Sequence, residues 1–591
     1  MAHYKTSLTC CCILLFSLVC AVGLICLCIA TLVDVGCPGG FRRAAVAADS
    51  KLCSEIGKNI LQQGGSAVDG AIAALLCTSV VNPQSMGIGG GSIVAVRNKT
   101  GNVTIYNFRE TVPQSFKANL LNDCPTKFGL STGTQSVRLH ILHLNIVGSQ
   151  WIGVPGELRG YEAIHKKYGR LPWNKLFEPT IKLAKEGFPM PDYLAAFLGN
   201  IFVKNHVEKS SLWADLLPIL SSFAFVYLCS DILCNKNKTV LGKGDTLRFP
   251  KLAETMEIIA KHGAEDFYSG KIGQDLIRDI KDAGGTLRME DLKSFKVRVT
   301  NAWTVSLGDV QMHFPPPPAG GALLAFILRI MKGFSLTSNS LFGDKKIQMY
   351  HHYIEAAKFA NGQKRSICDP LFDDTKSANH LLDQSFTNHI RNMINSNQTR
   401  EDSYYSNTKH SSDNMGTTHV SVLDENGLVV SATSTINQLF GGAVYSPRTG
   451  IILNNELADF CGRADKVRAG EQPPSSMTPV IMDTESGGTL VIGGSGGSMI
   501  TTAVAMSIMN HLWLGMSLKD AIAAPIVFVD SKNNVNFEKG FDESVKEGLR
   551  QYGHNIGNWK FFLNVVNAVK KENGCIEAVS DQRKMGMAAG Y

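Results

Sequence analysis

Hydrophobic and polar positions along the chain repeat with two different periods. In the first part, apolar residues recur at the three- and four-residue spacing of amphipathic helices. This spacing predicts helices at 50–63, 66–79, 157–167, 173–186, 252–262, 272–283 and 320–331. Later, a two-residue period predicts strands at 418–423, 428–435, 451–454, 479–483 and 490–493, then a helix at 499–514 and a further element at 541–552. Interleaved helices and strands predict an α/β (α+β) fold with strands sandwiched between helical layers.

One apolar stretch stands outside this pattern. Residues 7–33 hold no charge and exceed the roughly 20 residues that a membrane-crossing helix needs. A cleaved signal peptide, with an apolar region of about 7–15 residues, is the alternative. Asn-x-Ser/Thr sequons follow the stretch, at Asn98, Asn102, Asn237 and Asn397. We expect a cytoplasmic tail at 1–6, a transmembrane signal-anchor at 7–33 and a glycosylated extracellular body, as in a single-pass type II protein of the plasma membrane.

The composition indicates a large folded body. The chain has 591 residues, of which 44% are hydrophobic and 18% charged, so there is enough apolar material for an extensive core. The net charge of +7 is small for this length, and no basic cluster suggests a nucleic acid partner. His140 and His143 lack a nearby acidic or cysteine partner, so we expect no metal site. In an oxidising compartment, Cys229 and Cys234 are close enough in sequence to pair.

The segment from 413 to 437 carries the main candidate chemistry. It reads as a β-hairpin with an Asn-Gly turn. A two-residue loop would place Thr417 opposite Ile436, and a four-residue loop would place it opposite Ser434, so Thr435 lies within one residue in either register. A threonine hydroxyl becomes a nucleophile when a base activates it, and one such base is its own α-amine after the chain is cut before it. Gly416 permits the unusual backbone that such a cut needs. The alternative is a plain hairpin with threonines in strand positions.

Two glycine-rich segments allow other interpretations. The segment 86–92 precedes a predicted strand and lacks a following Gly-Lys-Ser/Thr, so we interpret it as a tight turn and not as a phosphate-binding loop. The segment 493–497 fits the Gly-x-Ser-x-Gly pattern of serine hydrolases. A nucleophilic Ser495 with Asp530 or Asp542 and His554 is therefore one alternative function. A non-enzymatic cell-surface glycoprotein is another.

Motifs from Ala47 to Tyr591 resemble the gamma-glutamyltransferase family of N-terminal-nucleophile hydrolases. They are 107–110 (Asn-Phe-Arg-Glu), 149–160, 416–421 (Gly-Thr-Thr-His-Val-Ser), 432–437, 450–456, 474–477, 493–497 and the terminal Ala-Gly-Tyr. Within the family, residues 444–457 and 561–569 are most similar to the type that hydrolyses leukotriene C4. The resemblance implies a four-layer αββα sandwich. It also implies self-cleavage between Gly416 and Thr417, giving a large subunit, 34–416, and a small catalytic subunit, 417–591.

The resemblance assigns a role to each site residue. Thr417 would attack a γ-glutamyl amide, Thr435 would hydrogen-bond to it, and the amides of Gly496 and Gly497 would stabilise the oxyanion. Arg109, Ser475 and Ser476 would bind the carboxylate of the glutamyl group. Asn437, Glu456 and Asp459 would bind its ammonium group. Family disulfide positions match Cys53 with Cys77 and Cys229 with Cys234.

The implied substrates are glutathione, glutathione conjugates and leukotriene C4, with water or the amine of an amino acid or dipeptide as acceptor and with no cofactor. The chain departs from the family pattern at 131–147 and 209–230. It also departs at Met415, where many members have a second glycine and where the change could slow self-cleavage.

Overall fold

The computed structural model describes residues 37, 39–124, 148–200, 203–204, 229–372, 378–406, 413, 415–441, 444–463, 466–559 and 565–591. Several features discussed above lie outside these residues. They are the predicted tail at 1–6, the apolar segment 7–33, the segment 131–147 with His140 and His143, and nearly all of 209–230. Within the described ranges, no helix combines the length and the apolar character that crossing a membrane requires.

Two antiparallel sheets form the centre of the body. The first has seven strands in the order β19-β1-β9-β10-β2-β3-β6, and the second has six in the order β18-β17-β14-β13-β8-β7. The strands of the first sheet are β1 (Ala45–Ala47), β2 (Gly91–Arg97), β3 (Val103–Asn107), β6 (Arg298–Asn301), β9 (Thr418–Leu423), β10 (Val429–Thr435) and β19 (Ala589–Gly590). Those of the second are β7 (Trp303–Ser306), β8 (Val310–Phe314), β13 (Val480–Thr484), β14 (Thr489–Ser495), β17 (Val565–Glu572) and β18 (Cys575–Val579).

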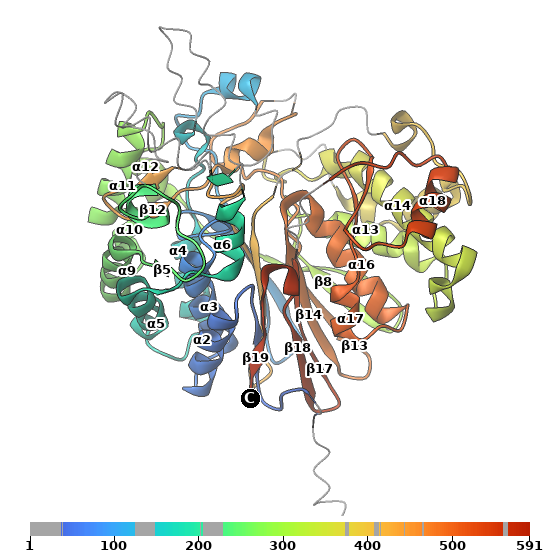
Figure 1. The fold of residues 1–591 in the computed structure, drawn as a ribbon, viewed down its shortest axis with the longest axis horizontal. Helices are drawn as coiled ribbons and strands as arrows, with labels where there is room; N and C mark the ends of the chain where they lie inside the picture. The colour runs from blue at the N-terminus through green and yellow to red at the C-terminus, as the bar shows by residue number, and fades with distance from the viewer. Residues whose placement is uncertain are drawn as a thin grey trace, which may run out of the picture. The chain divides into compact units, whose positions relative to one another are not determined.

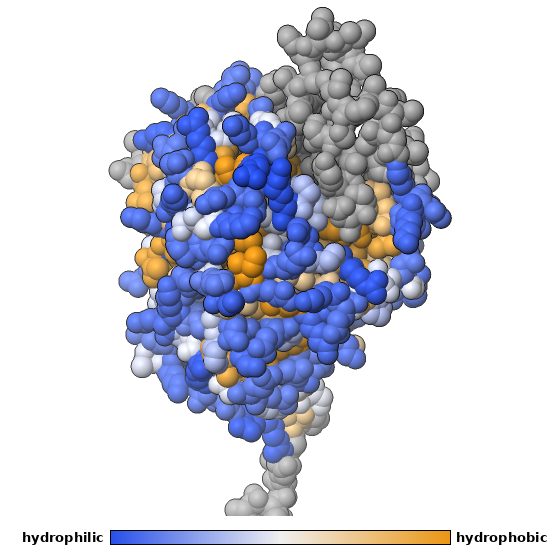
Figure 2. Space-filling model, turned by 90° about the vertical axis from the view of Figure 1, so that its left-hand side faces the viewer, coloured by the Kyte–Doolittle hydropathy of each residue, from blue (hydrophilic) through white to orange (hydrophobic). Residues whose placement is uncertain are grey.

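A layer of helices covers the outer face of each sheet (Figure 1). The first layer contains α2 (Lys51–Gln62), α3 (Ala67–Val81), α4 (Glu157–Tyr168), α5 (Trp173–Glu186), α6 (Asp192–Gly199), α9 (Pro250–His262), α10 (Glu265–Tyr268), α11 (Lys271–Asp282) and α12 (Met289–Ser294). The second contains α13 (Gly321–Lys332), α14 (Gly343–Gln363), α15 (Gln384–Met393), α16 (Ile500–Leu512), α17 (Leu518–Ala523) and α18 (Glu543–Gln551). Figure 2 views the side of the first layer, where hydrophilic residues cover most of the visible face and hydrophobic ones form small groups, as on a solvated surface.

The alternation of side chains along β9 explains why the strand is buried on both faces. Val420 and Val422 belong to the core under the first helical layer. Leu423 belongs to a second core, which fills the space between the two sheets and under the second helical layer. On the face toward the second sheet, Ser421 donates a hydrogen bond to the Asn567 carbonyl at 3.2 Å. The predicted αββα sandwich is therefore the observed architecture.

The register of the β9–β10 hairpin differs by one residue from each of the two predicted registers. Leu423 pairs with Val429 and Thr418 with Ser434, so the next position places Thr417 opposite Thr435. The loop of two or four residues predicted from sequence is wrong, because residues 425–427 form a three-residue loop. Gly427 adopts a φ of 80° there, which such a loop requires of its last residue. The turn predicted for the glycine-rich segment 86–92 is confirmed, since it leads into β2.

Eight of the described cysteines are disulfide-bonded: they form the pairs Cys53–Cys77, Cys124–Cys461 and Cys229–Cys234, and Cys37 and Cys575 are disulfide-bonded as well. Cys53–Cys77 and Cys229–Cys234 agree with the predicted pairs. Cys124–Cys461 was not predicted, because the two residues are 337 positions apart. Of the sequon residues, Asn102, Asn237 and Asn397 are exposed and Asn98 is half-buried in a surface turn.

Candidate active site

A cavity of about 300 Å³ lies at one end of the paired sheets and gathers the predicted site residues. Strands, short helices and loops far apart in sequence form its walls. The predicted residues that line it are Arg109, Thr417, Thr435, Asn437, Glu456, Asp459, Ser475, Ser476 and Gly497. Of the predicted set, Gly496 alone is not among the lining residues, and it lies immediately beside Gly497.

Thr417 precedes the first residue of β9 and is almost completely buried. Its hydroxyl donates a hydrogen bond to the Thr435 hydroxyl oxygen at 3.2 Å, which is the contact that the hairpin register predicts. Its backbone N–H donates to the Ser85 carbonyl at 3.1 Å. Its φ of 80° is rare for a β-branched residue, and strain of this kind concentrates at functional sites.

The structure shows why the residue before Thr417, Gly416, has no side chain. Its φ is 151°, and a Cβ at this position would lie 1.8 Å from the Asn437 carbonyl oxygen. Its own carbonyl oxygen accepts a hydrogen bond from the Gly496 N–H at 2.9 Å. The amide predicted to stabilise an oxyanion therefore already bonds to the carbonyl of the Gly416–Thr417 peptide. An N–H in this position polarises the carbonyl carbon toward attack by a neighbouring hydroxyl.

Arg109 links the predicted carboxylate-binding and ammonium-binding groups. Its guanidinium contacts the Glu456 carboxylate at 2.7 Å and the Asp459 carboxylate at 2.6 Å, and all three groups are largely buried. We expected two opposed patches, but the structure joins them directly, because buried charges are stable only when paired. Burial, reinforced by Asp459, raises the pKa of Glu456 to about 8 despite the opposing effect of Arg109.

Asn437 and the two serines complete the polar wall. The Asn437 N–H donates to the Thr435 hydroxyl oxygen at 2.8 Å, and its side-chain amide donates to the Asn455 carbonyl at 3.1 Å. The Ser475 hydroxyl accepts from the Met477 N–H at 3.1 Å. Together with Ser476, these groups offer hydrogen-bonding atoms on the side of the cavity where Arg109 lies.

Sequence reasoning missed a buried charge pair behind Thr417. The Lys584 ammonium donates to the Thr417 carbonyl oxygen at 2.8 Å, to an Asp49 carboxylate oxygen at 2.8 Å and to the Ser495 hydroxyl at 2.9 Å. Lys584 stands in a charged stretch near the chain end, and Asp49 lies before the first predicted helix. No local sequence signal connects the two residues.

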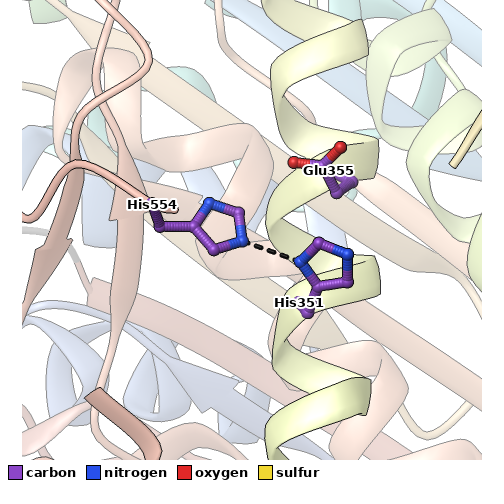
Figure 3. Close-up of side chains that lie close together, drawn as sticks. All are labelled: His351, Glu355 and His554. Atoms are coloured by element: carbon purple, nitrogen blue, oxygen red, sulfur yellow. Dashed lines mark hydrogen bonds between the residues drawn. The ribbon is translucent and has the colours of Figure 1, made fainter. Parts of the chain in front are cut away.

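The serine-hydrolase alternative is contradicted by the positions of its residues. Ser495 is fully buried and its hydroxyl accepts from Lys584. His554 instead faces His351 of α14, as Figure 3 shows, and the two rings are joined by a hydrogen bond of 2.8 Å. The other ring nitrogen of His554 accepts from Lys358 at 3.0 Å, so both of its nitrogens are occupied away from Ser495.

The same histidines form a cluster that resembles a metal site. Potential ligand atoms of His351, Glu355 and His554 lie within 4.8 Å of one another. Lysine can only donate, so His554 accepts from Lys358, donates to His351, and His351 in turn donates to the Asn395 carbonyl at 2.7 Å. Because this chain of hydrogen bonds engages every ring nitrogen and ends on a lysine, we assign the cluster a structural role.

The fold has a counterpart among solved structures. A solved structure described as cephalosporin acylase from Bacillus halodurans matches with a TM-score of 0.76 and 21% identity, covering 93% of this chain and 96% of that chain. At this identity the likeness shows the fold alone, which is the αββα sandwich described above.

Sequence comparison then identifies the family. The gamma-glutamyltranspeptidase family model matches residues 53–591, so the chain belongs to that family. Glutathione hydrolase 5 proenzyme of Rattus norvegicus is 46% identical over 94% of both chains, and the Homo sapiens protein of that name is 44% identical, also over 94% of both. The predicted family and its enzymatic class are confirmed.

Proposed function

We propose that the protein is a self-processing glutathione hydrolase that cuts itself between Gly416 and Thr417 and then transfers γ-glutamyl groups to water or to an acceptor amine. The main support is one hydrogen-bond pattern: the Thr417 hydroxyl bonds to Thr435 while the Gly496 amide bonds to the Gly416 carbonyl. The names of the rat and human relatives support both the substrate class and a precursor form.

In the self-cleavage step, the Thr417 hydroxyl oxygen attacks the Gly416 carbonyl carbon. The negative charge on the carbonyl oxygen is stabilised by the Gly496 N–H. The C–N bond breaks, the nitrogen takes the proton, and an ester joins Gly416 to the Thr417 oxygen. Water hydrolyses this ester, which frees the Gly416 carboxyl group and the Thr417 hydroxyl and leaves Thr417 with the free α-amine formed in the previous step.

In the catalytic cycle, the freed α-amine accepts the proton of the Thr417 hydroxyl as its oxygen attacks the γ-carbonyl of the substrate. The amides of Gly496 and Gly497 stabilise the oxyanion, and the C–N bond breaks with the proton passing to the leaving amine. The γ-glutamyl ester is then resolved by water or by the amine of an amino acid or dipeptide. Arg109 would attract the glutamyl carboxylate with its charge and its one remaining N–H, because its other N–H groups bond to Glu456, Asp459 and the carbonyls of Pro473 and Pro474.

The substrate range and the location of the protein are parts of the same proposal. Glutathione and its conjugates are the expected substrates, and leukotriene C4 is a further one because residues 444–457 resemble the type that hydrolyses it. We propose that residues 7–33 anchor the protein in the plasma membrane with its active site outside the cell. Exposed sequons at Asn102, Asn237 and Asn397 support an extracellular body.

Gel electrophoresis of the full chain, followed by hydrolysis assays, tests the proposal. The gel must be reducing, because the Cys124–Cys461 disulfide would otherwise hold the two products together. We expect two subunits for the wild type and for Thr417→Ser, and one chain for Thr417→Ala. Turnover of glutathione and of leukotriene C4 by the purified wild type measures the preference. A single inactive wild-type chain would favour the non-enzymatic alternative.

A further inference from the structure

Lys584 is a buried cation that the mechanism above does not use. It is only 4% exposed and follows the last strand of the second sheet, a few residues before the chain end. Its three hydrogen bonds, to the Thr417 carbonyl, Asp49 and Ser495, account for all three ammonium protons. A lysine this deeply buried is rare unless a charge partner is present.

Asp49 is that partner, and it is held as firmly as the lysine. One of its carboxylate oxygens accepts from the Thr418 hydroxyl at 2.7 Å as well as from Lys584, and the other accepts from the Asn567 side chain at 2.7 Å. The pair thus connects β1, β9, β17 and the C-terminal segment at one point below the nucleophile.

The cation lies nearer to Thr417 than the carboxylate does. Lys584 contacts the Thr417 carbonyl oxygen, and in any residue this oxygen lies about 3 Å from the backbone nitrogen. The ammonium is therefore within about 6 Å of the nitrogen that becomes the α-amine. A like charge at this range disfavours protonation of an amine. The Ser85 carbonyl, which accepts from the same nitrogen at 3.1 Å, fixes the direction of its N–H.

We propose that Lys584 is a positioning residue that keeps the freed α-amine of Thr417 in the neutral form that can accept a proton. This inference rests on the proposed function. Lys584 orients the first residue of the small subunit through its carbonyl and at the same time biases the charge state of the amine. Asp49 balances the cation so that it is stable in the interior.

Other charged groups around Thr417 are paired, lie near opposite charges or are exposed. Across the cavity, Arg109 is bonded to Glu456 and Asp459, and Arg463 is paired with Glu471. Lys364 lies in the field of Asp413 and Asp530, Arg365 is exposed at the cavity rim, and Tyr193 faces Asp49. Within the described part of the chain, Lys584 is the one charged side chain that hydrogen-bonds to Thr417.

The test is the pH dependence of the acylation rate at saturating γ-glutamyl-p-nitroanilide, normalised to the amount of processed Thr417. Saturation removes the contribution of Glu456, which acts on substrate binding. In Lys584→Met the acidic limb should move to higher pH by about 1 pH unit. In Lys584→Arg it should stay in place, and in Asp49→Asn it should move to lower pH.

Opposite shifts of the acidic limb in Lys584→Met and Asp49→Asn separate electrostatic action from structural damage. Structural damage would lower the rate of both variants without moving the acidic limb of either. Unmoved limbs, or shifts in the same direction, would overturn the inference. If Lys584→Met does not process, Asp49→Asn, which keeps the lysine, decides alone. An inactive wild type would refute the proposed function, whereas an active wild type with unmoved limbs would refute this inference only.

Discussion

Replacing Thr435 with valine removes a single oxygen from the site while preserving the shape of the side chain. That oxygen accepts two hydrogen bonds, from the Thr417 hydroxyl at 3.2 Å and from the Asn437 N–H at 2.8 Å. The first orients the nucleophile, and the second satisfies a buried amide. Thr435→Val therefore has two separable consequences, one for the reaction rate and one for stability.

The rate effect follows from the value of one hydrogen bond to the nucleophile. A buried partner left unsatisfied costs about 1–3 kcal/mol. If that cost falls on the transition state, acylation slows by roughly 5- to 160-fold, because each 1.36 kcal/mol is a factor of ten. The orphaned Asn437 amide should lower the free energy of unfolding by about 1–3 kcal/mol as well.

The assay measures release of p-nitroaniline from γ-glutamyl-p-nitroanilide per processed site, together with the urea unfolding midpoint. Thr435→Ser keeps the oxygen and is the matched control, so it should stay close to wild type in rate. An acylation rate for Thr435→Val within a factor of two of wild type would show that Thr435 does not orient Thr417, whatever happens to stability.

Three further changes have defined outcomes. Gly416→Ala should stop self-cleavage, since its Cβ would lie 1.8 Å from the Asn437 carbonyl, and should give a single band on a reducing gel; normal processing would contradict this. The KM for γ-glutamyl substrates should fall as pH rises through about 8, because Glu456 must lose its proton to bind the substrate ammonium, and Glu456→Gln should abolish this dependence. Cys461→Ser combined with Cys575→Ser should let the subunits separate on a non-reducing denaturing gel, unlike wild type, because these are the two cysteines of residues 417–591 and both are disulfide-bonded; subunits that stay joined would contradict this.

Strongly periodic segments were predictable from the sequence, whereas elements without a polar face were not. Helices α5 and α9 have clear amphipathic spacing and were predicted to within a few residues. The longest helix of the described residues, α14, was missed because residues 349–360 are buried all around it, so no polar stripe marks its period. Short strands such as β1 hold too few residues to show any period.

In the candidate site, too, some contacts could be predicted from a local sequence pattern and others could not. Thr417 and Thr435 could be placed together because a hairpin fixes its own register to within one residue. The pairing of Arg109 with Glu456 and Asp459 could not be derived locally, since more than 340 positions separate the partners; the family resemblance placed the three residues in one site but did not predict that they pair. For Lys584 and Asp49, 535 positions apart, there was neither a local pattern nor a motif.

The sheet topology determines what a cut before Thr417 can do to the molecule. In the first sheet, β9 of the small subunit pairs with β1 of the large one, and β10 pairs with β2. In the second, β13 pairs with β8. The cut therefore separates neither sheet, and the hydrogen bonds of these ladders hold both subunits in place. Because the new chain end lies beside Ser85, Lys584 and Thr435, which belong to elements that the cut leaves intact, the energetic change at the site is local. It consists of a freed amine, a released carboxyl group and space for the substrate where the Gly416 carbonyl had been.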